Sequence, residues 1–231
     1  MKNILARGGV EFLAVFLGIA LSLWVDKYRE NKNAEELNFQ ILSRIYDNLE
    51  IDSLDAIWNY KAHKIKPAAA KRVISWCKEG QPQSDSINLF ISRLAIATIF
   101  TNNDEEYNAL KASGNMGLIK NDQLIKALYN YYSEVEYIKY IDETIDKQVV
   151  EQFIPFMSNY SNFYGYSNIY DVFDNAFNSF IIIKNPPKEK LKFYASMFAS
   201  QSSSRAFVYK RLQGKIIELR NLIRQELRSN I

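Results

Sequence analysis

Apolar residues recur along most of this chain at the three- and four-residue spacing of amphipathic α-helices. The first stripe consists of Leu37, Ile41, Ile45, Leu49 and Ile57. The last stripe consists of Leu212, Ile216, Leu219 and Ile223, which alternate between four- and three-residue steps as in a coiled-coil seam. The pattern predicts an all-α fold, an antiparallel helical bundle whose C-terminal helix packs along the N-terminal one.

Proline, glycine and capping residues predict where these helices end. Pro67 should break or kink the first helix, while Gly80 and Gly114 are natural stops for later ones. The further helices expected before the C-terminal one are 68–78, 86–99, 105–112 and 124–150. Asn121 or Asp122 should cap the last of these. The serines between 200 and 204 should weaken the C-terminal helix midway.

The N-terminal region differs from the rest because it is apolar on all sides. From Phe12 to Val25 there are 14 residues with nothing more polar than a serine, whereas a membrane-spanning helix needs roughly 20. Starting at Ile4 gives 22 residues but includes Arg7 and Glu11, which are spaced to pair near the headgroups. We therefore predict a short tail over 1–8, a transmembrane helix over 9–26 and a helical domain outside the bilayer over 27–231. A cleaved signal peptide and a buried helix are the alternatives.

One face of the predicted span carries small residues. Ala14, Gly18 and Ser22 form a ladder at four-residue spacing, which lets two helices approach closely and indicates self-association. Glu11 lies near the same side and has two interpretations. It is either an intramembrane titrating group or the interfacial partner of Arg7.

Two other segments are candidate contact surfaces. Residues 153–180 are rich in aromatic side chains, and Tyr164, Tyr166 and Tyr170 would suit a partner surface. The alternative is a loop-rich lid over the bundle. The second segment is a row formed by Arg220, Arg224 and Arg228, which would suit anionic lipid or simply face solvent.

The composition limits the chemistry that the chain can carry. His63 is the single histidine and Cys77 the single cysteine, so a zinc site with several Cys or His ligands cannot be built, and no motif places a catalytic triad around the one histidine. Asp142, Glu143 and Asp146 alternate with lysines and are interpreted as a solvated face. We expect no enzyme and no cofactor. A net charge of +3, with no aromatics between the C-terminal arginines, also argues against nucleic acid as a partner.

Two motifs resemble a bacterial family of single-pass membrane proteins whose function is uncharacterised. The first motif comprises Gly8, Glu11, Leu13, Val15, Gly18, Ile19 and Leu23. The second comprises Leu110, Ser113, Gly114, Leu118, Ile119, Leu124 and Tyr132. The resemblance implies an uncleaved anchor in the bacterial inner membrane and a helical domain, and it carries no activity. Three basic groups lie on each side of the span, so charge does not fix the orientation. We place the helical domain in the periplasm.

The function predicted from these patterns is that of a membrane-anchored interaction or scaffold protein. It should contact membrane lipid, form homo-oligomers and bind a membrane-protein partner that the sequence does not identify. The alternative from a different class is a subunit of an ion- or proton-conducting assembly in which Glu11 titrates. Ligand sensing by the aromatic segment is a third reading.

Overall fold

A computed structural model describes residues 2–164, 173 and 179–229, with side chains from residue 12 onward. The chain is almost entirely helical, as predicted. The long helices are α1 (Lys2–Lys78), α4 (Asp122–Gln148) and α6 (Lys188–Ser229). The shorter helices are α2 (Ser86–Leu94), α3 (Glu105–Ala112), η1 (Asn115–Leu118), η2 (Val149–Phe153) and α5 (Ile154–Met157). Two short strands, β1 (Ser161–Phe163) and β2 (Phe180–Ile182), form an antiparallel pair in which Asn162 lies opposite Ile181.

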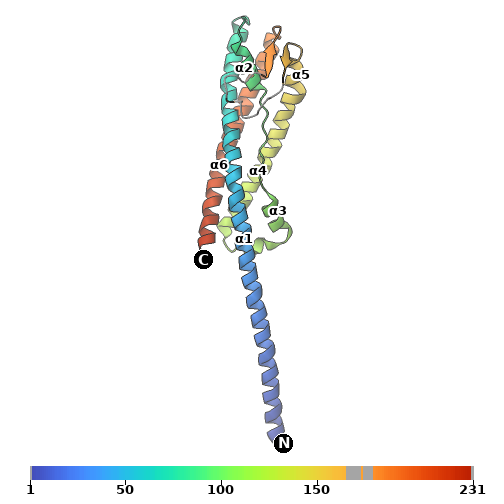
Figure 1. Cartoon of the computed structure of the whole chain (residues 1–231), viewed down its shortest axis with the longest axis vertical. Helices are drawn as coiled ribbons and strands as arrows, with labels where there is room; N and C mark the ends of the chain where they lie inside the picture. Colours follow the sequence, from blue (N-terminus) through green and yellow to red (C-terminus); the bar gives the residue numbers. More distant parts are fainter. Residues whose placement is uncertain (1, 165–172, 174–178, 230–231) are drawn as a thin grey trace.

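The three long helices form an elongated bundle (Figure 1). α6 runs back along α1, which confirms the predicted packing of the C-terminal helix on the N-terminal one. α4 packs mainly on α6, and α2 covers the far end of α1. Between α2 and α3 the chain runs along the bundle without helix or strand over residues 95–104, a segment that we call the strap (Figure 1). The N-terminal part of α1 projects beyond the bundle as a lone helix (Figure 1).

Two apolar cores lie one above the other along the bundle axis. The lower core joins α1 around Leu42 to α4 around Leu128 and to α6 around Leu219. The predicted C-terminal stripe of Leu212, Ile216, Leu219 and Ile223 is buried here to 1% exposure or less. The upper core gathers the end of α1, α2, the η2–α5 turn and the start of α6 around Phe153. Polar and charged side chains occupy the level between the two cores.

Several predicted helix ends are confirmed by backbone geometry. Gly80 and Gly114 follow the ends of α1 and α3 with φ angles of 94° and 73°, a left-handed conformation that glycine adopts without strain. Asn121 caps α4, because its side-chain oxygen accepts hydrogen bonds from the backbone N–H groups of Gln123 and Leu124. These ends were predictable because the signals are local.

The break predicted at Pro67 and the helix end predicted at Ile99 are wrong. α1 continues through Pro67 to Lys78, although proline has no N–H to donate to the carbonyl of His63. Buried residues on both sides of it, Ala62 and Ala69 among them, pack into the bundle and offset that loss. α6 likewise continues through the serines at 200–204. α2 ends at Leu94 instead of reaching Ile99, because the chain there passes into the strap.

Among the residues that the structure describes, no helix has a stretch long and apolar enough to cross a membrane. The predicted transmembrane helix over 9–26 is therefore not supported. The apolar run from Phe12 is 14 residues long, and Asp26 and Lys27 follow it directly.

Candidate functional site

The residues predicted for membrane association lie on the projecting part of α1. Ala14, Gly18 and Ser22 are all exposed there. A side chain added at Gly18 would meet no atom of the chain within 4 Å, so the ladder is open to a second molecule. The side chain of Glu11 lies outside the described residues.

Of the three tyrosines predicted to form a partner surface, the structure describes Tyr164 alone. Tyr164 is 67% exposed at the end of β1, and its backbone N–H donates to the carbonyl of Ser179. Tyr166 and Tyr170 lie outside the described residues. Part of the same aromatic segment is interior, since Phe153 and Phe180 are fully buried in the upper core.

Two members of the arginine row contact α1. Arg224 donates to the hydroxyl of Tyr46 at 2.6 Å, and the Arg220 guanidinium lies over the ring of Tyr46 with its centroid 4.5 Å away. Arg220 also pairs with Glu50 at 3.0 Å. Arg228 is exposed near the end of α6. The first two arginines thus have intramolecular partners.

The densest polar constellation lies between the two cores, and the sequence analysis did not identify it. We call it the ionic layer, and its charged members are Lys66 of α1, Asp142 and Asp146 of α4, and Arg205 of α6. All four are at most 7% exposed, which is rare for charged residues unless they are paired. Asp142 and Asp146 were interpreted as a solvated face. This is wrong, because they continue the buried stripe that Val135 and Ile138 begin on α4.

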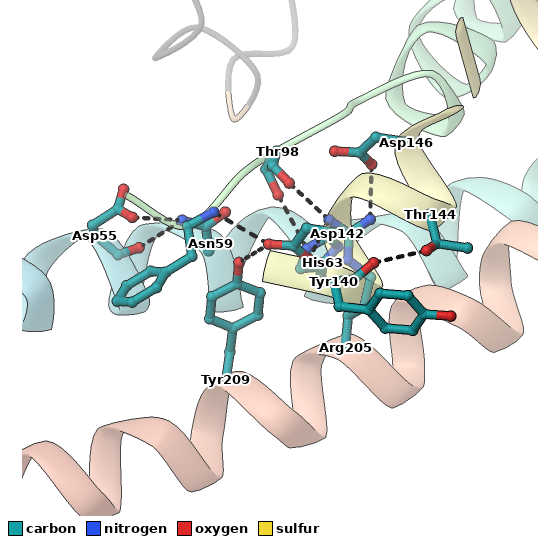
Figure 2. Close-up of polar contacts among 11 residues, drawn as sticks. Asp55, Asn59, His63, Thr98, Tyr140, Asp142, Thr144, Asp146, Arg205 and Tyr209 are labelled. Carbon is teal, nitrogen blue, oxygen red and sulfur yellow. Dashed lines mark hydrogen bonds and ion pairs between the residues drawn. The ribbon is translucent and has the colours of Figure 1, made fainter. Parts of the chain in front are cut away.

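Arg205 is the centre of the ionic layer (Figure 2). Its Nη2 lies 2.7 Å from Asp142 Oδ1 and its Nη1 lies 2.9 Å from Asp146 Oδ1. The same Nη2 donates to the carbonyl of Thr98 in the strap at 2.7 Å. Tyr209, one turn along α6, donates its hydroxyl to Asp142 Oδ2 at 2.5 Å. Helix α6 is thereby joined to α4 and to the strap.

Burial shifts the protonation of the groups in this layer. It lowers the pKa of Lys66 to about 7, with the nearby Arg205 acting in the same direction and the two aspartates opposing it. Burial also holds the pKa of His63 well below its usual value, so this imidazole is neutral. It raises the pKa of Asp142 and Asp146, and Arg205 opposes that rise. The two carboxylates in turn raise the pKa of Arg205 despite its burial.

Aspartate side chains of α1 and α4 accept hydrogen bonds from the backbone of the strap. A buried extended segment needs acceptors for its N–H groups. Asp142 accepts from Phe100 N at 3.2 Å, Asp55 from Thr101 N at 2.9 Å and Asp52 from Asn103 N at 3.0 Å. Three carboxylates from two helices thus replace the partner strand that the strap lacks.

His63 and Tyr131 extend this network to either side. His63 Nε2 lies 3.1 Å from the hydroxyl of Thr98, and its ring stacks on Tyr209. Tyr131 donates its hydroxyl to Asp52 at 2.5 Å. Its centre at Arg205 is buried and pairs opposite charges, whereas Asp55 and Thr101 lie at its solvent-facing edge, so the centre of the network joins the helices of the bundle to the strap.

Metal binding has no site in the described part of the chain, where no three histidine, cysteine or acidic side chains are grouped to hold an ion. Cys77 is buried, and burial raises the pKa of its thiol. No family model, curated protein or solved structure compared with the chain matches it. The resemblance of the two motifs to a family of membrane proteins stays a prediction.

Proposed function

We propose that the protein is a membrane-anchored helical interaction protein whose anchor also mediates self-association. The observation that carries the proposal is the projecting part of α1. Its large apolar side chains, Phe12, Leu13, Val15, Phe16, Leu17, Ile19, Leu21, Leu23, Trp24 and Val25, are each 43–70% exposed. Because they are nearly consecutive, they cover all sides of the helix, which is typical of a buried or membrane-inserted helix.

The free energy of burying this segment is large. Moving one such side chain out of water gains about 1.5–3 kcal/mol, so even the exposed fractions of ten of them sum to the order of 10 kcal/mol. The exposed run is about 21 Å long at 1.5 Å per residue. Residues 4–11 extend it to about 33 Å, close to the ~30 Å thickness of a bilayer core.

Helix continuity fixes how the bundle would stand on the membrane. α1 continues unbroken from the apolar run through a polar stalk over 26–37, and Asn38 is the first buried residue that follows. The stalk holds the bundle about 20 Å beyond Val25. Arg220 and Arg224 lie opposite Tyr46, about 30 Å from Val25, which exceeds the ~10 Å range of screened charge. We therefore assign membrane contact to the anchor and an intramolecular role to these two arginines.

Flotation with phosphatidylcholine–phosphatidylglycerol vesicles tests the anchoring. We expect the full chain to float and the L17D/L21D variant to remain at the bottom, because each intramembrane aspartate costs about 2.5–3.5 kcal/mol. The matched control is I217D on α6, whose parent residue is 60% exposed like Leu21. The proposed membrane anchor would be refuted if all three proteins floated equally, or if the unaltered chain did not float.

Self-association is tested separately at Gly18. Because a side chain there meets nothing in the monomer, Gly18→Ile acts only if a second helix approaches. Ala20→Ile, on the opposite side of the same helix, is the control. We expect the detergent-solubilised chain to be an oligomer whose mass falls in the Gly18 variant and not in the Ala20 variant. An unaltered chain that is monomeric would exclude self-association.

The alternative function, a conducting assembly, depends on Glu11. Glu11→Gln should leave both flotation and oligomer mass unchanged under our proposal, whereas loss of vesicle ion or proton flux in this variant would favour the alternative. The bilayer in this proposal is the bacterial inner membrane, with the bundle in the periplasm.

A further inference from the structure

A groove of about 680 Å³ lies on the side of the bundle, between α1 and the strap. Its walls are aliphatic, and the side chains of Ile51, Leu54 and Ile99 are 58–67% exposed. Exposed aliphatic side chains that cluster around one hollow are typical of binding sites. The volume lies within the usual range for small-molecule pockets, roughly 300–1,000 Å³.

The end of α2 explains why the groove is open. Further along the same face of α1, Ala62 and Ile65 are covered by Leu89 of α2 and by Ile96 just beyond it. α2 ends at Leu94, the strap follows along the edge of the groove, and within the described part of the chain Ile51 and Leu54 stay exposed. The apolar face therefore continues below α2 without the helix that covers it above.

The charge of the groove is set by one residue. Among the described residues that line it, Asp55 is the only charged one. Its Oδ2 accepts hydrogen bonds from Thr101 N at 2.9 Å and from Asn59 Nδ2 at 3.2 Å. Its Oδ1 accepts none from the part of the chain that the structure describes. Partial burial raises the pKa of this carboxyl, and among the described residues no cation opposes that rise.

An aromatic ring completes the site. Trp58 lines the groove one turn beyond Asp55, and Phe173 packs edge-on against its indole with the ring centroids 6.0 Å apart. The face of an indole attracts an ammonium group, and a carboxylate adds a charge-assisted hydrogen bond. Aliphatic walls, an indole and an unbalanced carboxylate are together complementary to an organic cation with an apolar body.

We propose that the groove around Leu54, Asp55 and Trp58 is a binding site for a lipophilic organic ammonium ion. The apolar body lies against Ile51, Leu54 and Ile99, and the ammonium group donates to Asp55 Oδ1 beside the indole. The site is independent of the membrane anchor, because it lies more than two dozen residues further along α1.

The experiment titrates the full chain in detergent by calorimetry with three probes that share one body. These are 4-phenylbutylamine, 4-phenylbutanol and 4-phenylbutanoate, each corrected by a blank titration into micelles. We expect the amine to bind at least tenfold more tightly than the alcohol, and the carboxylate to bind more weakly than either. Equal binding of the three probes, or no binding of the amine beyond the blank, would overturn the proposal.

Three variants locate the binding. D55N keeps an acceptor for Thr101 and should reduce the preference for the amine over the alcohol to within about twofold. D47N removes a carboxylate that is exposed two turns away on α1 and should leave the preference unchanged. L54A, which alters an exposed side chain, should weaken the amine and the alcohol alike. If D47N acts as strongly as D55N, or if L54A has no effect on either probe, the cation is held elsewhere and the proposal fails.

Discussion

Replacing Arg205 by methionine tests whether the ionic layer holds the bundle together. The variant keeps an unbranched apolar stem and removes the guanidinium that contacts Asp142, Asp146 and the carbonyl of Thr98. Two carboxylates and one carbonyl would then be buried without their partner. Breaking a buried ion pair costs about 3–5 kcal/mol, and leaving a carbonyl unpaired about 1–3 kcal/mol more. Because such losses are not additive, we expect unfolding free energy to fall by about 4 kcal/mol or more.

Urea unfolding of the full chain in detergent, followed by far-UV circular dichroism, measures this loss. In thermal unfolding the same change corresponds to a decrease in Tm of about 8–16 °C for a chain of this size. The matched control is Arg211→Met, also on α6. Arg211 pairs with Glu134 but its side chain is 45% exposed, and Lys215 remains as a second partner of that carboxylate. Its loss should cost about 0–1 kcal/mol.

A difference between the two variants of less than 1 kcal/mol would refute the reasoning. The triple variant R205M/D142N/D146N examines the cause. Asparagine retains an acceptor for Phe100 N while removing the uncompensated charge, so the triple variant should be more stable than R205M alone. If the triple variant were less stable than R205M, the unpaired charge of Asp142 and Asp146 would not be the source of the lost unfolding free energy.

Three further predictions concern single positions. Gly114→Ala should lower the free energy of unfolding by about 1 kcal/mol, because alanine is strained at a φ of 73°. Gly117→Ala, where the added side chain also meets no other atom, should be nearly neutral. Equal urea midpoints of the two variants would contradict this prediction. Asn121→Ala should cost about 1 kcal/mol through loss of the α4 cap, and an unchanged midpoint would show that the cap is dispensable. Lys66 has a pKa of about 7 in the folded chain and about 10.4 when unfolded, so between these values the unfolded state binds more protons. The free energy of unfolding should therefore rise with pH from about 7 to 10, by up to ~1.4 kcal/mol per pH unit. Urea unfolding at pH 7, 8 and 9 measures this rise, which K66M should lack. If K66M keeps the rise, a group other than Lys66 causes it.

The sequence by itself determined the helical class of this protein and much of its layout. The stripe from Leu212 to Ile223 predicted a buried face on the last helix, and the cap at Asn121 and the stop at Gly114 placed two boundaries. These features are local, because helical periodicity and capping depend on residues a few positions apart. The apolar run from Phe12 to Val25 was equally plain in the sequence, and the bundle leaves it exposed.

Only the tertiary structure decided where the charges lie. Asp142 continues the apolar stripe of Val135 and Ile138, but this spacing does not show whether its carboxylate has a partner, because Arg205 is 63 residues away and the strap that it binds is 42 residues away. The same holds for the continuation of α1 through Pro67, where packing on both sides outweighs a lost hydrogen bond. A charged residue on a helical stripe can face water or a distant partner. The local pattern is the same in both cases, and only the arrangement of α1, α4, α6 and the strap distinguishes them.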